Sequence, residues 1–148
     1  MSGLSRALLM VALVVVAGAV VIAVRGRGSG IPSVSEVPAS LPAGGVSLNG
    51  VVVLKPLVTR PAHVLSKAAA IKSARADAAK HSSAARAMEA AVTISGDPHL
   101  QSTPAWIVTF DYAKPINISG SKTPELVTHD SIFVDASTGK LLLGIYTK

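Results

Sequence analysis

Thr103-Pro-Ala-Trp-Ile-Val-Thr-Phe-Asp-Tyr112 is the stretch with the strongest β-forming character in this chain of 148 residues. Large apolar and aromatic side chains alternate along it, which is typical of a half-buried strand. The alternation predicts one face made of Trp106, Val108, Phe110 and Tyr112, and an opposite face made of Ile107 and Thr109. Two roles are open for the aromatic face: a core surface that covers a helix, or, if Trp106 faces outwards, a binding platform.

The C-terminal part predicts a β-hairpin. Residues 131–136 and 140–146 are two apolar runs, separated by Ser137-Thr138-Gly139. Gly139 can adopt the positive φ that such a short loop requires. Asp135, just before the turn, either accepts hydrogen bonds from the turn N–H groups or contacts a partner. Between the central strand and this hairpin, residues 113–128 are expected to form a loop, because they combine Pro115, Gly120 and several hydroxyl-bearing residues.

A helix is predicted on the N-terminal side of the central strand. Ser66 is a good N-cap, and the alanine-rich stretch 67–80 follows it. The helix either stops near His81 or continues, broken, to about residue 87, and a further strand is expected over 90–95. One apolar stripe at three- and four-residue spacing would face the sheet: Val64, Ala68, Ile71, Ala74 and Ala78.

The N-terminal part is of a different kind. Residues 7–24 are uncharged and mostly apolar, and as a helix they would be about 27 Å long, close to the ~30 Å of a bilayer core. We expect a retained membrane anchor. The alternative is a signal peptide cleaved near Ala17-Gly18-Ala19. Arg6 on one side and Arg25 with Arg27 on the other do not decide the orientation in the membrane.

The expected domain organisation has three parts. Residues 1–27 are the anchor, 28–60 a linker and lead-in rich in Pro, Gly and Ser, and 61–148 the folded domain. Within the second part, 28–46 is predicted to be a flexible spacer, and Asn49-Gly50 marks a turn before a short edge strand or ordered lead-in. The fold class is therefore α+β: a transmembrane helix, a flexible linker, and one helix packed on a small antiparallel sheet.

Composition narrows the function classes. The chain has no cysteine, which excludes disulfides and thiolate metal sites. Its net charge is +6, but from Gly28 onwards there are 11 Lys and Arg against 8 Asp and Glu, a net of +3. We therefore expect no nucleic-acid partner. Membrane lipid is the expected partner of residues 7–24.

No motif in the chain points to catalysis. The histidines His63, His81, His99 and His129 lack metal-ligand spacing, and neither a Gly-x-Ser-x-Gly elbow nor a glycine-rich phosphate loop is present. We expect a protein that is not an enzyme, with no cofactor, no metal and no catalytic residue. A pocket with converging titratable groups would restore the alternative of a small enzyme.

The helix opening Ser66-Lys-Ala-Ala-Ala-Ile71, the strand Pro104–Phe110 and above all Val134-Asp-Ala-Ser-Thr-Gly-Lys-Leu141 resemble the PepSY domain, over roughly residues 61–148. The resemblance implies a small helix-and-sheet unit of the bacterial cell envelope, acting outside the cytoplasm and restraining or regulating a peptidase. It implies an interaction or structural role for Asp135, Thr138 and Gly139. A structural or assembly subunit of an envelope complex, unrelated to proteolysis, is the alternative.

Overall fold

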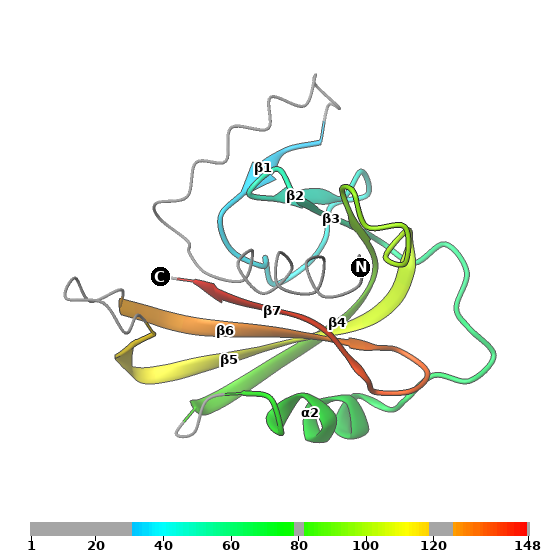
Figure 1. Cartoon of the computed structure of the whole chain (residues 1–148). Coiled ribbons are helices and arrows are strands. Elements are labelled where there is room, and N and C mark those ends of the chain that lie inside the picture. The colour runs from blue at the N-terminus through cyan, green and yellow to red at the C-terminus, as the bar shows by residue number, and fades with distance from the viewer. Residues whose placement is uncertain (1–30, 79–81, 119–125, 148) are drawn as a thin grey trace, which may run out of the picture.

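The computed structural model describes residues 31–78, 82–118 and 126–147. Its main feature is a seven-stranded mixed sheet in which the strands lie in sequence order, β1 to β7 (Figure 1). Strands β1 and β2 are parallel, and every later neighbouring pair is antiparallel. The strands are β1 Ser33–Val34, β2 Val46–Leu48, β3 Val52–Lys55, β4 Ser82–Ile94, β5 Thr103–Asn117, β6 Leu126–Asp135 and β7 Leu141–Thr147.

The expected α+β fold class is therefore wrong. Within the described ranges the regular structure is almost entirely strand, and helix is limited to the nine residues of α2, Lys67–Arg75. The transmembrane helix expected over 7–24 lies outside the described residues. Within them, no helix has both the length and the apolar character that crossing a bilayer requires.

The alanine-rich region is the first reason for this difference. Ser66 caps α2 as predicted, since its Oγ accepts a hydrogen bond from the Ala69 N–H at 3.2 Å. The helix ends at Arg75, however, and from Ser82 the chain forms the thirteen-residue strand β4. The predicted broken helix to about residue 87 is therefore wrong. Pairing of β4 along β5 overrides the helix propensity of alanine in this segment.

The N-terminal strands are the second reason. Residues 33–55, expected to be spacer and lead-in, supply β1, β2 and β3, and β3 pairs with the end of β4. Asn49 and Gly50 make the predicted turn, both with positive φ (50° and 72°). Because Val46, Leu48 and Leu54 are buried in the core, this part of the chain belongs to the folded unit and is not a flexible spacer.

The core has two parts, one on each face of the strongly curved sheet. On the face that we call the inner face, β1–β3 fold back over β4–β7 (Figure 1) and enclose residues such as Leu54, Ile107 and Phe133. On the opposite, helix face, α2 packs against β4, β5 and β6. Ala70 and Ala74 are fully buried there, so small residues let the helix approach the sheet closely.

Strand β5 is the centre of both core parts. Its predicted alternation is confirmed, since Trp106, Val108 and Phe110 lie in the helix-side core and Ile107 in the inner core. Strand β5 runs on to Asn117 and β6 starts at Leu126, so the loop expected over 113–128 is shorter than predicted. The hairpin of β6 and β7 is present as predicted, and Gly139 has a φ of +72°.

Candidate functional site

The hairpin turn between β6 and β7 is built around Asp135. Its Oδ1 accepts hydrogen bonds from the Ser137 N–H at 2.9 Å, the Thr138 N–H at 2.7 Å and the Thr138 hydroxyl at 2.9 Å. Burial alone would raise the pKa of Asp135, but these hydrogen bonds and the charge of Lys140 together hold it below 3.8, the usual value. All the polar capacity of Oδ1 is thus used inside the turn, which favours the structural role of Asp135, Thr138 and Gly139.

Trp106 and Phe110 lie inside the molecule. Trp106 is 7% exposed, and its indole Nε1 donates to the Leu65 carbonyl at 3.0 Å. Phe110 is fully buried, with the Arg75 guanidinium 4.8 Å from its ring centroid. These contacts support the interpretation of the aromatic face as part of the core. Trp106 and Phe110 are too buried to form a binding platform.

The third aromatic residue of that face belongs to a polar group. The Tyr112 hydroxyl donates to Asp130 Oδ2 at 3.2 Å, and Asp130 is paired in register with Tyr146 of β7. Burial, followed by the negative charge of Asp130, raises the pKa of Tyr146 above 10.0. No sequence pattern predicts this group, because it is assembled from three strands and depends on their register.

The described residues contain one arrangement that resembles a catalytic constellation. His129 Nδ1 lies 2.8 Å from Asp111 Oδ1, and Arg86 Nη2 lies 3.5 Å from the same oxygen. Two residues further along β6, Ser131 shares a hydrogen bond of 2.8 Å with Thr109. The Ser131 side chain is 1% exposed and its hydroxyl already has a partner, so it is not placed to attack a substrate. This geometry does not support hydrolysis by Ser131.

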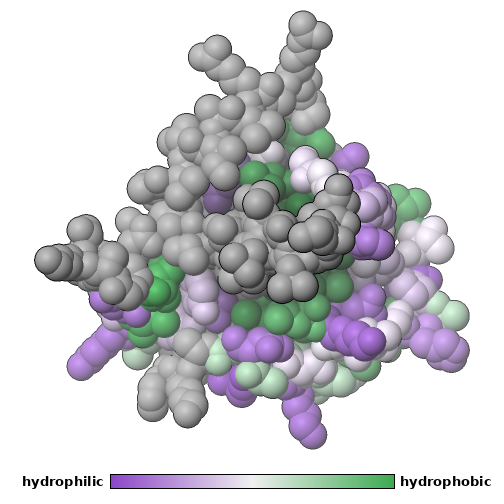
Figure 2. All heavy atoms as spheres, in the orientation of Figure 1, coloured by the Kyte–Doolittle hydropathy of each residue, from purple (hydrophilic) through white to green (hydrophobic). Residues whose placement is uncertain are grey.

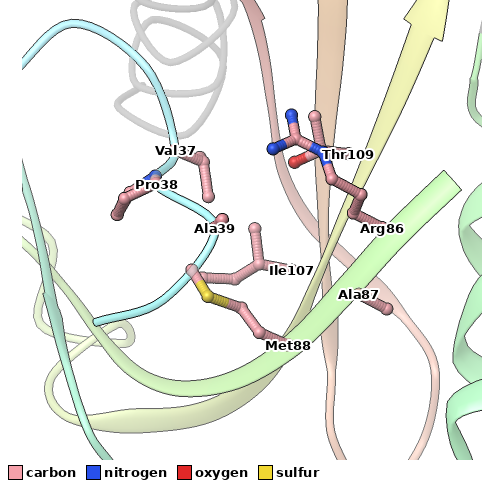
Figure 3. A pocket seen from close by; sticks show the side chains of 8 residues that line it. All are labelled: Val37, Pro38, Ala39, Arg86, Ala87, Met88, Ile107 and Thr109. Carbon is pink, nitrogen blue, oxygen red and sulfur yellow. The ribbon is translucent and has the colours of Figure 1, made fainter.

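A small hollow adjoins this cluster on the inner face (Figure 3). Arg86, Met88, Ile107 and Thr109 line one side, and the loop Val37–Ala39 lines the other. The hollow has a volume of about 30 Å³, which suits a water molecule or two. Sites for small organic ligands are about ten times larger or more. It therefore does not resemble a substrate or cofactor pocket.

Metal binding finds no support in the described parts of the chain. They contain no group of three or more His, Asp and Glu side chains that could hold an ion. His63 and His99 are exposed, and His129 is engaged with Asp111. His81 falls outside the described residues.

The connection from β3 to α2 is the most exposed apolar feature. It spans residues 56–66 and swings away from the body of the protein (Figure 1). Val58 in this connection is 100% exposed. Two contacts attach this connection to the body of the protein. Arg60 forms an ion pair with Glu89 of β4, and the Leu65 N–H donates a hydrogen bond to the Ala136 carbonyl at 2.8 Å. Residues 56–60 of this connection belong to the predicted lead-in, and the rest to the predicted folded domain. The two prolines of the connection are the signal that could have marked it as an extended loop.

Comparison with known proteins gives no relatives. No protein-family model matches the chain, and neither a curated protein nor a solved structure matches it.

Proposed function

We propose that this protein is a non-catalytic interaction module held at a bacterial plasma membrane by residues 7–24, with its folded part outside the cytoplasm, where it restrains an envelope peptidase. The PepSY-like pattern of residues 61–148 and the apolar N-terminal run support this proposal. The hollow beside Arg86 is too small for a substrate, and the buried Ser131 hydroxyl is not placed as a nucleophile, so the described residues favour binding over catalysis.

The single observation that carries the proposal is the loop Pro56–Pro61. A fully exposed valine in a loop attached to the body of the protein can enter an apolar pocket of a partner. Proline fixes its own φ and keeps the preceding residue out of the helical region. Pro56 and Pro61 therefore restrict the backbone at the two ends of the loop before binding, which lowers the entropy cost of association.

The test uses the full-length chain added to peptidase-containing membranes of the source organism. We expect the wild type to lower casein hydrolysis, and Val58→Asp to lose roughly tenfold or more in potency, because a charge cannot enter an apolar pocket without large desolvation cost. Leu126→Asp is the matched control. Leu126 is also an exposed large apolar residue, 49% accessible, but lies on β6 far from the loop in sequence.

Two outcomes contradict the proposal. Equal inhibition by the wild type and Val58→Asp would show that the loop is not the binding surface. Hydrolysis unaffected by the wild type, together with stable capture of a non-peptidase envelope complex by the membrane-bound chain, would favour the alternative of an assembly subunit.

A further inference from the structure

The two edges of the sheet differ sharply. Strand β1 has only two residues, directly after Pro32, so it offers little backbone for another strand. Strand β7 has seven residues and, among the described residues, pairs with β6 alone. Its sequence Leu141-Leu-Leu-Gly-Ile-Tyr-Thr147 contains no charge and no proline, the usual devices that keep edge strands from pairing.

Strand β7 is also apolar, and its apolar side chains are not fully covered within the described chain. Leu142, Leu143 and Ile145 are only partly buried against the inner core, and Leu141 is 51% exposed. Figure 2 shows apolar atoms just below the centre of the face viewed, where β7 runs in Figure 1. An edge that is long, uncharged and apolar is a site for strand pairing with another chain.

We propose that two copies of this chain pair through β7, antiparallel and around a two-fold axis near Gly144, so that their sheets become continuous. In this register Leu143 lies opposite the partner's Ile145, and Gly144 lies opposite the same residue of the other copy. No charge lies within the paired stretch 141–147, so the edge can meet itself without repulsion. A closed two-fold pair also uses up both β7 edges, which prevents further growth.

The position of the chain entry favours a second copy over an unrelated strand. A two-fold axis that relates antiparallel strands is perpendicular to the sheet, so the inner faces of both copies point to the same side. The described chain begins at Ile31 beside β1, which folds over the inner face (Figure 1). The described chains of both copies would therefore begin on the same side of the pair, as two anchors in one membrane require. This step rests on the proposed membrane attachment, whereas the pairing of β7 does not.

The natural absence of cysteine allows a direct test on the full-length chain in detergent and in native membranes. In Gly144→Cys the two introduced residues would have Cα atoms about 4.5–5.5 Å apart, within the range that a disulfide bridges. The new Cβ would meet only Ile132 Cδ1, at an ordinary 3.5 Å, so the substitution fits the fold. Ser33→Cys, an exposed position on the opposite edge strand β1, is the matched control.

Mild oxidation is expected to give disulfide-linked dimers of Gly144→Cys in several-fold excess over Ser33→Cys. Equal yields from the two variants would overturn the proposal, because random collision would explain both. A monomer whose introduced thiol resists maleimide would also overturn it, since another segment or a different protein would then cover β7. A monomer whose introduced thiol reacts with maleimide would overturn it too, because the β7 edge would then be unoccupied.

A second variant keeps the test informative if Gly144→Cys does not fold. Leu141→Asp places a charge in the paired stretch of both copies. It is expected to lower the dimer fraction, measured by sedimentation of the detergent-solubilised chain, roughly five- to tenfold. Leu126→Asp, with nearly the same exposure (49% against 51%), is expected to leave it unchanged. These readouts do not involve Val58, so failure of the pairing and failure of the proposed peptidase restraint can be told apart.

Discussion

Trp106 and Leu65 are 41 residues apart in sequence, and the indole N–H of the first donates to the carbonyl of the second at 3.0 Å. The bond joins the central strand to the residue before the N-cap of α2. Leu65 in turn donates its N–H to the Ala136 carbonyl at the end of β6. Leu65 thus fixes where the helix begins relative to both β5 and β6. The position of α2 therefore depends on contacts between residues that are distant in sequence.

Trp106→Phe should therefore loosen the attachment of α2. The loss of one hydrogen bond and of part of a buried ring should lower the free energy of unfolding by about 1–3 kcal/mol. Urea denaturation followed by circular dichroism measures the change. Tyr112→Phe is the comparison, since it also removes one donor but keeps its ring volume. Unaltered stability in Trp106→Phe would show that the bond to Leu65 does not hold the helix.

Local signals in the sequence were sufficient for several elements. Ser66 as N-cap, the Asn49-Gly50 turn, the alternation along β5 and the hairpin closed by Gly139 all follow from preferences of the residues themselves. Each of these features is decided within a few residues of the chain, so a single sequence suffices to predict it.

The remaining elements depend on partners distant in sequence. Ala85 and Ala87 are good helix formers, yet they pair with Phe110 and Val108 in the sheet, where their small side chains leave room beside α2. Strands β1–β3 are short, and they are stabilised by pairing along the sheet to β4 and by burial of their side chains in the inner core. The Asp111–His129 pair likewise needs the register of β5 on β6. Neither composition nor periodicity specifies such pairings.

Gly139 is expected to tolerate alanine poorly. Its φ is +72°, and an added Cβ would lie 2.7 Å from Ser73 Oγ and 3.0 Å from Leu65 Cδ1. Gly50 has the same φ of +72° with nothing within 4 Å, so Gly50→Ala reports the backbone strain alone. That strain is about 1 kcal/mol.

The difference between the two variants measures the crowding between the hairpin and α2. We expect Gly139→Ala to be less stable than Gly50→Ala by about 1–3 kcal/mol in thermal or chemical unfolding. Equal losses would mean that Ser73 and Leu65 move aside freely, and that the close contact of the turn with α2 adds nothing to stability.

Asp135 should make stability depend on acid pH. Its pKa is below 3.8 in the folded chain, because the turn hydrogen bonds outweigh the effect of burial. In the unfolded chain the pKa is about 3.9. The stabilisation is fully present above that value and is lost as pH falls from it through the lower folded pKa.

Comparing Asp135→Asn with the wild type isolates this contribution, since other carboxylates titrate in both proteins. The stability difference between them should shrink as the pH is lowered below about 4. Asp77→Asn, at an exposed position just after α2, serves as the control for the removal of one carboxylate outside the turn. A pH-independent difference for Asp135→Asn would contradict the role of the ionised carboxylate in the turn.

Tyr146 should make the folding stability of the chain depend on pH in the alkaline range. Burial and then the charge of Asp130 raise its pKa above 10.0, so the folded chain keeps the phenolic proton at pH values where the unfolded chain has released it. Stability from this group is complete below the unfolded pKa and falls as pH rises from about 10 through the folded pKa. Tyr146→Phe removes the effect and should flatten the alkaline stability profile. The chain has two tyrosines, so subtracting the tyrosinate absorbance of Tyr146→Phe from that of the wild type isolates the titration of Tyr146. A midpoint at or below 10 would contradict the packing of Tyr146 beside Asp130, and would place the end of β7 in contact with water.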